Sequence, residues 1–175
     1  MKGRSAWVAV LAASVMAAGC GQKAKQEVNA AKVEHAMAEL GIAAVWQAYR
    51  SAGPAADLKA YVDIYSNEVA YSAPGTPTLR RLPAVREYLA DKFKKSHYLE
   101  TDVLLGVPMI EGDHAMQFGS YWEIRSEDGK NPHATDYGQF AAELRRESDG
   151  KWRIWRHQMT LDSSVVWMKP KPAAR

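Results

Sequence analysis

Apolar residues first recur at a helical spacing in the N-terminal third of the chain. Between Val33 and Ala52 they lie three or four positions apart, which predicts a helix with a single apolar stripe. The stripe comprises Val33, Met37, Leu40, Ala44, Ala48 and Ala52. The dipeptide Gly53-Pro54 follows directly. We expect the helix to end there, because neither residue continues a helix well.

Two shorter helices are expected next, one on each side of a strand. Asp57 suits the N-terminus of the first, and Pro83 fits the first turn of the second. The strand covers Glu68–Ala73, and the prolines and glycine of residues 74–77 then form a turn. The residues expected to face inward on these helices are Leu58, Tyr61, Val62, Tyr65, Val85, Tyr88, Leu89 and Phe93.

After Ser96 the apolar period changes from that of a helix to the alternation of strands. Four strands are predicted, at Tyr98–Val107, His114–Arg125, His133–Arg146 and Lys151–Asp162. Asp, Gly and charged residues at 111–113, 127–130 and 149–151 are turn signals between them. The pattern therefore predicts an α+β domain that ends in an antiparallel meander. Tyr71, Trp152 and Ile154 are expected in its core.

The N-terminus has the three regions of an export signal. Lys2 and Arg4 precede the apolar run Ala6–Ala13, and small residues follow as far as Cys20. The apolar run is too short to span a bilayer, which takes about 20 residues. We therefore expect a cleaved signal peptide rather than a membrane helix.

The stretch from Val15 to Cys20 resembles the lipobox of bacterial lipoproteins, although Ala17 stands where that family usually has a branched apolar residue. The resemblance implies cleavage between Gly19 and Cys20, and diacylglycerol on the Cys20 sulfur. Cys20 is the only cysteine of the chain, which fits a residue kept for lipid rather than for a disulfide. Gly21 is not the aspartate of an inner-membrane retention signal. The expected location is the outer membrane, facing the periplasm, with the membrane as partner through the lipid anchor.

These signals divide the chain into four parts. We expect a signal peptide at 1–19, a lipidated tether at 20–28, one globular domain at 29–165 and a flexible tail at 166–175. Loss of Lys2 and Arg4 with the signal leaves 21 basic against 20 acidic residues. A nucleic-acid-binding protein would concentrate positive charge, so nucleic acid is not an expected partner.

From about Val45 to Asp162 the chain resembles the SnoaL-like, or DUF4440, branch of the NTF2-like superfamily. The residues that carry the resemblance are Trp46 to Tyr49, Asp57-Leu58, Tyr65, Pro74-Gly75, Ala84-Val85, Asp128-Gly129, Tyr137 to Phe140 and Asp149 to Ile154. The resemblance implies a cone of three helices wrapped on a curved antiparallel sheet around a mainly apolar pocket, and homodimers that pack sheet against sheet. Arg81 departs from it, because relatives have glycine there. We expect a different backbone path at that point, since arginine does not readily take a positive φ.

Ketosteroid isomerase, a member of this superfamily, works with an aspartate base and an oxyanion hole made by a tyrosine and a protonated aspartate. By position, Tyr49 matches the oxyanion tyrosine of the first helix. Ala73 occupies the place of the base, and the second acid should lie near Ala142. The chain therefore lacks two of the three groups of that mechanism at the expected places.

The remaining polar and aromatic residues leave the function open. The candidate pocket residues are Trp46, Tyr49, Tyr71, Tyr121, Asp136, Trp155 and His157. The five histidines show no ligand spacing, and the only thiol is expected to carry lipid, so we expect neither a metal, a cofactor nor covalent catalysis. Three hypotheses stand: a non-catalytic domain that binds a small apolar or aromatic ligand or a partner, a cofactor-free isomerase, cyclase or hydratase, and a structural role in an envelope complex. An acid and a base that converge in the pocket would favour the enzyme.

Overall fold

The computed structural model describes residues 9–166, with their side chains from residue 25 onward. The chain divides into two compact units, Met1–Ala38 and Glu39–Arg175. In its described part the first unit is the N-terminal portion of helix α1 (Ala9–Ala52), whose side chains from Lys25 to Met37 are exposed. The expected charged start of the signal peptide and nearly all of the expected tail lie outside the described residues. Among the helices described here, none has the length and apolar character needed to cross a membrane.

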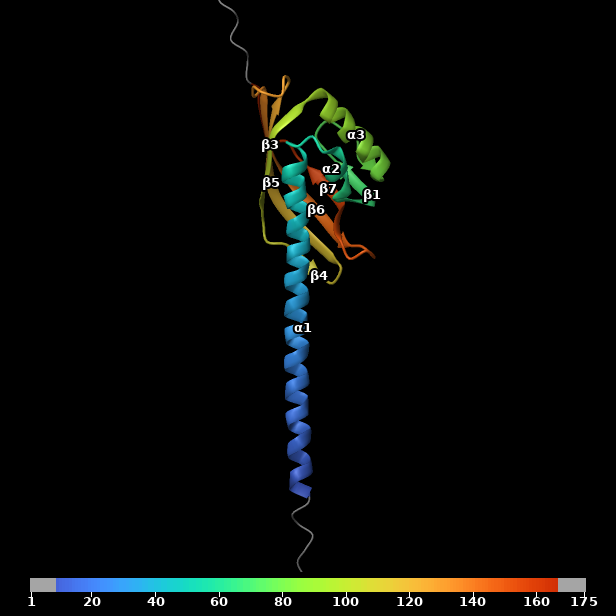
Figure 1. Cartoon of the computed structure of the whole chain (residues 1–175), viewed down its shortest axis with the longest axis vertical. Helices are drawn as coiled ribbons and strands as arrows, with labels where there is room; N and C mark the ends of the chain where they lie inside the picture. Colours follow the sequence, from blue (N-terminus) through green and yellow to red (C-terminus); the bar gives the residue numbers. More distant parts are fainter. Residues whose placement is uncertain (1–8, 167–175) are drawn as a thin grey trace, which may run out of the picture. The chain divides into compact units, whose positions relative to one another are not determined.

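One eight-stranded sheet is the framework of the second unit (Figure 1). Its central strands follow the order β2-β1-β7-β6-β5-β3, while β4 pairs with β5 and β8 pairs with β6. Helices α2 and α3 pack beside β1 (Figure 1). The elements after α1 are α2 (Leu58–Asp63), β1 (Tyr65–Ser72), β2 (Leu79–Arg80), α3 (Leu82–Lys95), β3 (His97–Leu105), β4 (Met109–Glu111), β5 (His114–Ser126), β6 (Ala134–Arg146), β7 (Trp152–Met159) and β8 (Ser163–Val166).

The four strands expected after Ser96 are confirmed as β3, β5, β6 and β7. Their turns are confirmed as well, since Gly112, Gly129 and Gly150 have φ angles of 56°, 73° and 78°. Asp57 caps α2 as expected, because its carboxylate accepts a hydrogen bond of 2.9 Å from the Ala60 N–H. The strands β2, β4 and β8 were not predicted. They are two to four residues long, too short for an alternating pattern to be recognised.

The first strand of the sheet pairs with the last long one. Strands β1 and β7 run parallel, with Tyr71 opposite His157, whereas the pairs β3–β5, β5–β6 and β6–β7 are antiparallel. The sheet is therefore antiparallel except at this junction. The parallel pair places residues of β1 beside residues of β7 on the face that carries the core.

Helix α1 ends at Ala52 as expected, but the apolar stripe chosen from the sequence is wrong for most of its length. Leu40 is 65% exposed and Ala44 is also exposed. The buried face of α1 in this unit carries Ile42, Val45, Trp46, Tyr49 and Ala52. The two stripes have the same helical period, and the one with the aromatic rings is buried because it removes more apolar surface from water.

The expected core residues are confirmed. Tyr71, Trp152 and Ile154 are 2%, 5% and 0% exposed. Trp152 packs directly against α1 at Gly41, where an added Cβ would lie 2.4 Å from Trp152 Cδ1. A glycine inside a helix is unfavourable by itself, and here it permits the close approach of the indole ring.

The expectation of a different backbone path at Arg81 is wrong. Arg81 has φ 70° and ψ 148°, a region that is nearly restricted to glycine. Its N–H donates a hydrogen bond of 2.8 Å to the Val69 carbonyl, and α3 begins at the next residue. The backbone thus keeps a glycine-like conformation although the side chain is that of arginine.

We therefore predict that Arg81→Gly stabilises the domain. Relief of the strained φ, which costs about 1–3 kcal/mol, exceeds the entropy of a glycine in the unfolded chain, roughly 0.5–1 kcal/mol. The free energy of urea unfolding should rise by about 1 kcal/mol. The matched control is Arg80→Gly, since Arg80 lies in β2 without a positive φ and should lose stability on replacement. Equal losses in both variants would contradict the prediction.

Candidate functional site

A shell of aromatic rings surrounds one histidine inside the second unit. His157 of β7 is 2% exposed. The ring centroids that lie between 5.7 and 6.2 Å from its imidazole are those of Trp46, Tyr49, Tyr65, Tyr71 and Phe140. These residues come from α1, β1 and β6, so the shell forms only when the helix and the sheet have packed together.

The two nitrogens of His157 have different surroundings. Nδ1 lies 3.1 Å from the hydroxyl of Tyr65, which is 1% exposed. Nε2 is buried and has no hydrogen-bond partner within the described part of the chain. Burial lowers the pKa of His157 to about 3, because the imidazolium would lose its hydration in this interior. The ring is therefore neutral at ordinary pH.

A carboxylate enters the same aromatic interior from β5. Glu123 is 4% exposed and opposes Thr101 of β3 in the sheet. Its Oε1 accepts a hydrogen bond of 3.4 Å from the Tyr49 hydroxyl. Burial, reinforced by this carboxylate, raises the pKa of Tyr49 well above its usual value. The Tyr49 hydroxyl therefore keeps its proton and remains a hydrogen-bond donor. Its acceptor, Glu123, was not among the residues selected from the sequence.

Lys92 of α3 supplies the countercharge. Its Nζ lies 3.9 Å from Glu123 Oε2 and within 5.8 and 5.6 Å of the ring centroids of Tyr88 and Tyr98. Burial disfavours the ammonium, but the Glu123 carboxylate together with Tyr98, Tyr71 and Tyr88 outweighs burial and raises the pKa of Lys92 well above its usual value. Tyr49, Glu123 and Lys92 therefore form a charged cluster at the wall of the aromatic shell.

Trp46 is fixed by hydrogen bonds as well as by packing. Its Nε1 donates to Gln117 Oε1 at 2.7 Å, and Gln117 Nε2 donates to the Gly106 carbonyl at 2.7 Å. Its ring centroid lies 4.6 Å from that of Phe140. These contacts hold α1 against β5 and β6, so that Tyr49, one turn further along, reaches Glu123.

The residues selected from the sequence separate into two groups. Trp46, Tyr49, Tyr71 and His157 meet in the aromatic interior. The other three are engaged elsewhere: Tyr121 donates 3.0 Å to the Thr160 carbonyl, Asp136 pairs with Arg125 at 2.8 Å, and the Trp155 ring lies 4.3 Å from the Arg156 guanidinium. Ala73 and Ala142 are buried alanines, so no carboxylate occupies either of those two places.

Sequence reasoning missed Glu123, Lys92 and Tyr65 as parts of one cluster. Tyr65 was expected on the buried face of α2, but it begins β1. For Glu123 the signal was present, because it shares the inward parity of Gln117 and Tyr121 on β5, which are also buried. A charged residue at an inward strand position is unusual enough to be taken as a candidate.

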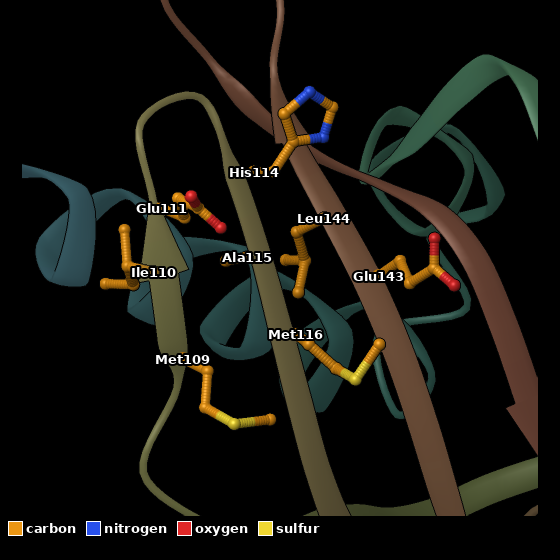
Figure 2. A pocket seen from close by; sticks show the side chains of 8 residues that line it. All are labelled: Met109, Ile110, Glu111, His114, Ala115, Met116, Glu143 and Leu144. Carbon is orange, nitrogen blue, oxygen red and sulfur yellow. The ribbon is translucent and has the colours of Figure 1, made fainter.

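Two hollows lie along the strands of the sheet. One of about 490 Å³ is lined by β4, β5 and β6, and Figure 2 shows Met109 and Met116 among its side chains. A second, of about 310 Å³, shares Met116 and Glu143 with it and also includes Phe118 and His157. Met109 and Phe118 are 58% and 51% exposed. Within residues 9–166, no group of three or more His, Cys, Asp or Glu side chains could hold a metal ion.

Comparison with known protein families shows to which family the chain belongs. The sequence profile of the SnoaL-like domain matches residues 34–158, which include α1 from Glu34, the aromatic shell and nearly all of β7. The chain belongs to the SnoaL-like family. The part matched contains Tyr49, Glu123 and His157. No curated protein matches the chain.

Solved structures place this SnoaL-like chain among NTF2-like folds. A hexachlorocyclohexane dehydrochlorinase has a TM-score of 0.65 at 11% identity, with 82% of this chain and 99% of that one covered. A putative scytalone dehydratase from Novosphingobium aromaticivorans has a TM-score of 0.64 at 12% identity, with 81% and 96% covered. A ketosteroid isomerase-like protein from Erwinia carotovora has a TM-score of 0.61 at 18% identity, with 70% and 94% covered. At these identities the likeness establishes the fold alone.

The buried histidine leads to a prediction about pH. His157 has a pKa of about 3 when folded, against about 6.5 in an unfolded chain, so only the unfolded state takes up its proton as the pH falls between these values. Its contribution to stability is complete above pH 6.5 and is lost towards pH 3, at about 1.4 kcal/mol per pH unit. Urea unfolding at several pH values should show a shallower dependence in His157→Phe than in wild type. The same dependence in both proteins would contradict the prediction.

Proposed function

We propose that this SnoaL-like domain binds a small aromatic or apolar molecule in its interior and does not transform it. The observation that carries the proposal is Glu123, a carboxylate buried among aromatic rings. Removing a charge from water costs several kcal/mol, and a well-packed apolar residue would often serve stability as well or better. Buried charged residues that reduce stability in this way are concentrated at functional sites.

The contacts of Glu123 leave it capacity for a further donor. A carboxylate has two oxygens with about four acceptor positions. Tyr49 approaches only to 3.4 Å and Lys92 to 3.9 Å, both at the long end of direct contact. A ligand hydroxyl, or an amine, would bind there more closely. The surrounding rings of Trp46 and Tyr49 favour a flat, apolar body for the rest of the molecule.

Native mass spectrometry of the protein purified from envelopes tests this proposal. The wild type should retain a small molecule, or bind phenols in a ligand-observed NMR screen, and Glu123→Leu should do neither. The matched control is Glu143→Leu, because Glu143 lies on the neighbouring strand in the wall of the outer hollows. Loss of binding in both variants, or an empty wild type that binds no phenol, would contradict the proposal.

A cofactor-free enzyme is the second candidate. It is favoured by the meeting of a carboxylate, Glu123, with the neutral His157 ring through their common neighbour Tyr49. A carboxylate can take a proton next to a carbonyl group while neutral donors stabilise the resulting oxyanion. Exchange of the α-hydrogens of acetophenone for deuterium, catalysed by the wild type and lost in Glu123→Gln, would favour this candidate over simple binding.

We further propose that lipid on Cys20 anchors the domain to the envelope, facing the periplasm. The support is the charged, apolar and small-residue order before Cys20 and the lack of any other cysteine. Two or more acyl chains hold a protein stably on a membrane, whereas one binds marginally. The intact mass of envelope-purified wild type should correspond to a chain that begins at acylated Cys20. A soluble, unlipidated product cut elsewhere, or identical products from wild type and Cys20→Ala, would contradict it.

We also propose a homodimer through the outer face of the sheet. Exposed apolar side chains gather there on β3, β4, β5 and β6, at Leu104, Met109, Phe118 and Tyr137. Surfaces of this kind mark sites of association. Light scattering should give twice the mass of one chain for the wild type and a monomer for Phe118→Glu. Leu161→Glu is the control, being 45% exposed outside the strands. A monomeric wild type would contradict the dimer.

A further inference from the structure

One nitrogen of His157 is left without a hydrogen bond inside the aromatic shell. Two other donors of the shell are paired, since Trp46 donates to Gln117 and Tyr49 donates to Glu123. Nε2 of His157 has no partner among the described residues, although it is shielded from solvent; the other buried side-chain atoms of this kind are Thr101 Oγ1 and Arg125 Nε. A buried polar atom without a hydrogen bond costs about 1–3 kcal/mol. A ligand group that forms this missing hydrogen bond therefore binds with a more favourable free energy.

The tautomer of His157 is inferred from its one hydrogen bond. The Tyr65 hydroxyl lies 3.1 Å from Nδ1, and either atom of this pair can be the donor. Burial raises the pKa of Tyr65 far above its usual value, so the hydroxyl keeps its proton. With Nδ1–H as donor, both that proton and Nε2 would lack partners among the described residues, whereas with Tyr65 as donor only Nε2 does. We therefore assign the proton of the neutral imidazole to Nε2, which makes the unpartnered atom a donor.

A second donor with a poor acceptor lies on the neighbouring strand. Tyr71 is opposite His157 in the parallel β1–β7 pair, and their ring centroids are 5.7 Å apart. The Tyr71 hydroxyl donates to the thioether sulfur of Met159 at 3.5 Å. Thioether sulfur is a weak acceptor, which an oxygen would readily replace. Two neutral donors thus stand side by side on adjacent strands.

We infer that His157 Nε2–H and the Tyr71 hydroxyl together bind a carbonyl oxygen of the ligand. The inference rests on the proposed function and specifies the chemical class of the ligand as an aromatic ketone, aldehyde or quinone. A neutral acceptor fits better than a carboxylate or phenolate. Glu123 already places one negative charge in this interior, and Lys92 is committed to it, so a second anion would be repelled. His157 binds the ligand here and takes up no proton.

Nitrogen-15 NMR of the ligand-free protein tests the tautomer separately from any binding. The expected result is a protonated Nε2 and an unprotonated Nδ1 for His157, unchanged between pH 8 and pH 5. In Tyr65→Phe the hydrogen bond to Nδ1 is gone, and the two tautomers should mix. A wild-type ring protonated on Nδ1, or one that titrates near pH 6.5, would overturn the inference whatever the ligand does.

Binding of acetophenone and of ethylbenzene, which has a methylene group in place of the carbonyl, tests the site itself. The wild type should bind acetophenone about 3- to 10-fold more tightly than ethylbenzene, which corresponds to the net free energy of one or two hydrogen bonds. His157→Phe should lose this preference. Tyr71→Phe, which removes only a hydroxyl and so spares the fold, should reduce it. Gln158→Leu, the exposed neighbour on β7, should keep it.

The outcomes separate the two proposals. Equal binding of both compounds by the wild type would overturn the carbonyl site and leave the interior as a ligand-binding site. Binding of neither compound, together with an empty protein from envelopes, would refute the proposed function and the inference that rests on it. A preference retained in His157→Phe would place the carbonyl elsewhere and overturn the inference alone.

Discussion

Buried polar side chains from distant parts of the sequence pair with one another inside this domain. Trp46, Tyr49 and Tyr65 each carry a hydrogen-bond donor into the interior, and each partner comes from a strand far away in the sequence. Gln117, Glu123 and His157 are those partners. The pairs fix how deeply α1 sits on the sheet and where β1 lies against β7, because a shift of either would leave a buried group unsatisfied. The arrangement of the interior is thus set by polar complementarity as much as by apolar packing.

Local signals were sufficient for the helices, for the longer strands and for the order of these elements along the chain. The glycines at 112, 129 and 150 allow positive φ and mark three hairpins, and Asp57 caps its helix, so these features could be read from a few neighbouring residues. The face of α1 could not. Leu40 and Tyr49 belong to stripes of the same period, and only the shape of the sheet decides which stripe is covered. Arg81 was misjudged because hydrogen bonding and the start of α3 hold a conformation that its side chain disfavours.

The candidate site was foreseen only in part, for a related reason. Tyr49, Tyr71 and His157 were each selected by position or type, but nothing local shows that they surround one another. Glu123 and Lys92 meet because β5 and α3 face each other across the interior, and this neighbourhood depends on the register of the whole sheet. A one-residue slip would turn the Glu123 side chain to the opposite face. Long-range register is what a single sequence conveys least.

The parallel pairing of β1 with β7 also governs the order in which the domain can be completed. Tyr65 and His157, which meet across this junction, are 92 residues apart in the chain. The ribosome makes β7 as the last long strand, so the interior stays open, with an unpaired strand edge on β1, until almost the whole domain has been synthesised. Closing so large a loop is slow, and the open state exposes aromatic surface. A chain that ends before β7 therefore lacks both His157 and the strand that pairs with β1. The aromatic shell then stays open on that side, and we expect such a truncated chain to aggregate rather than fold.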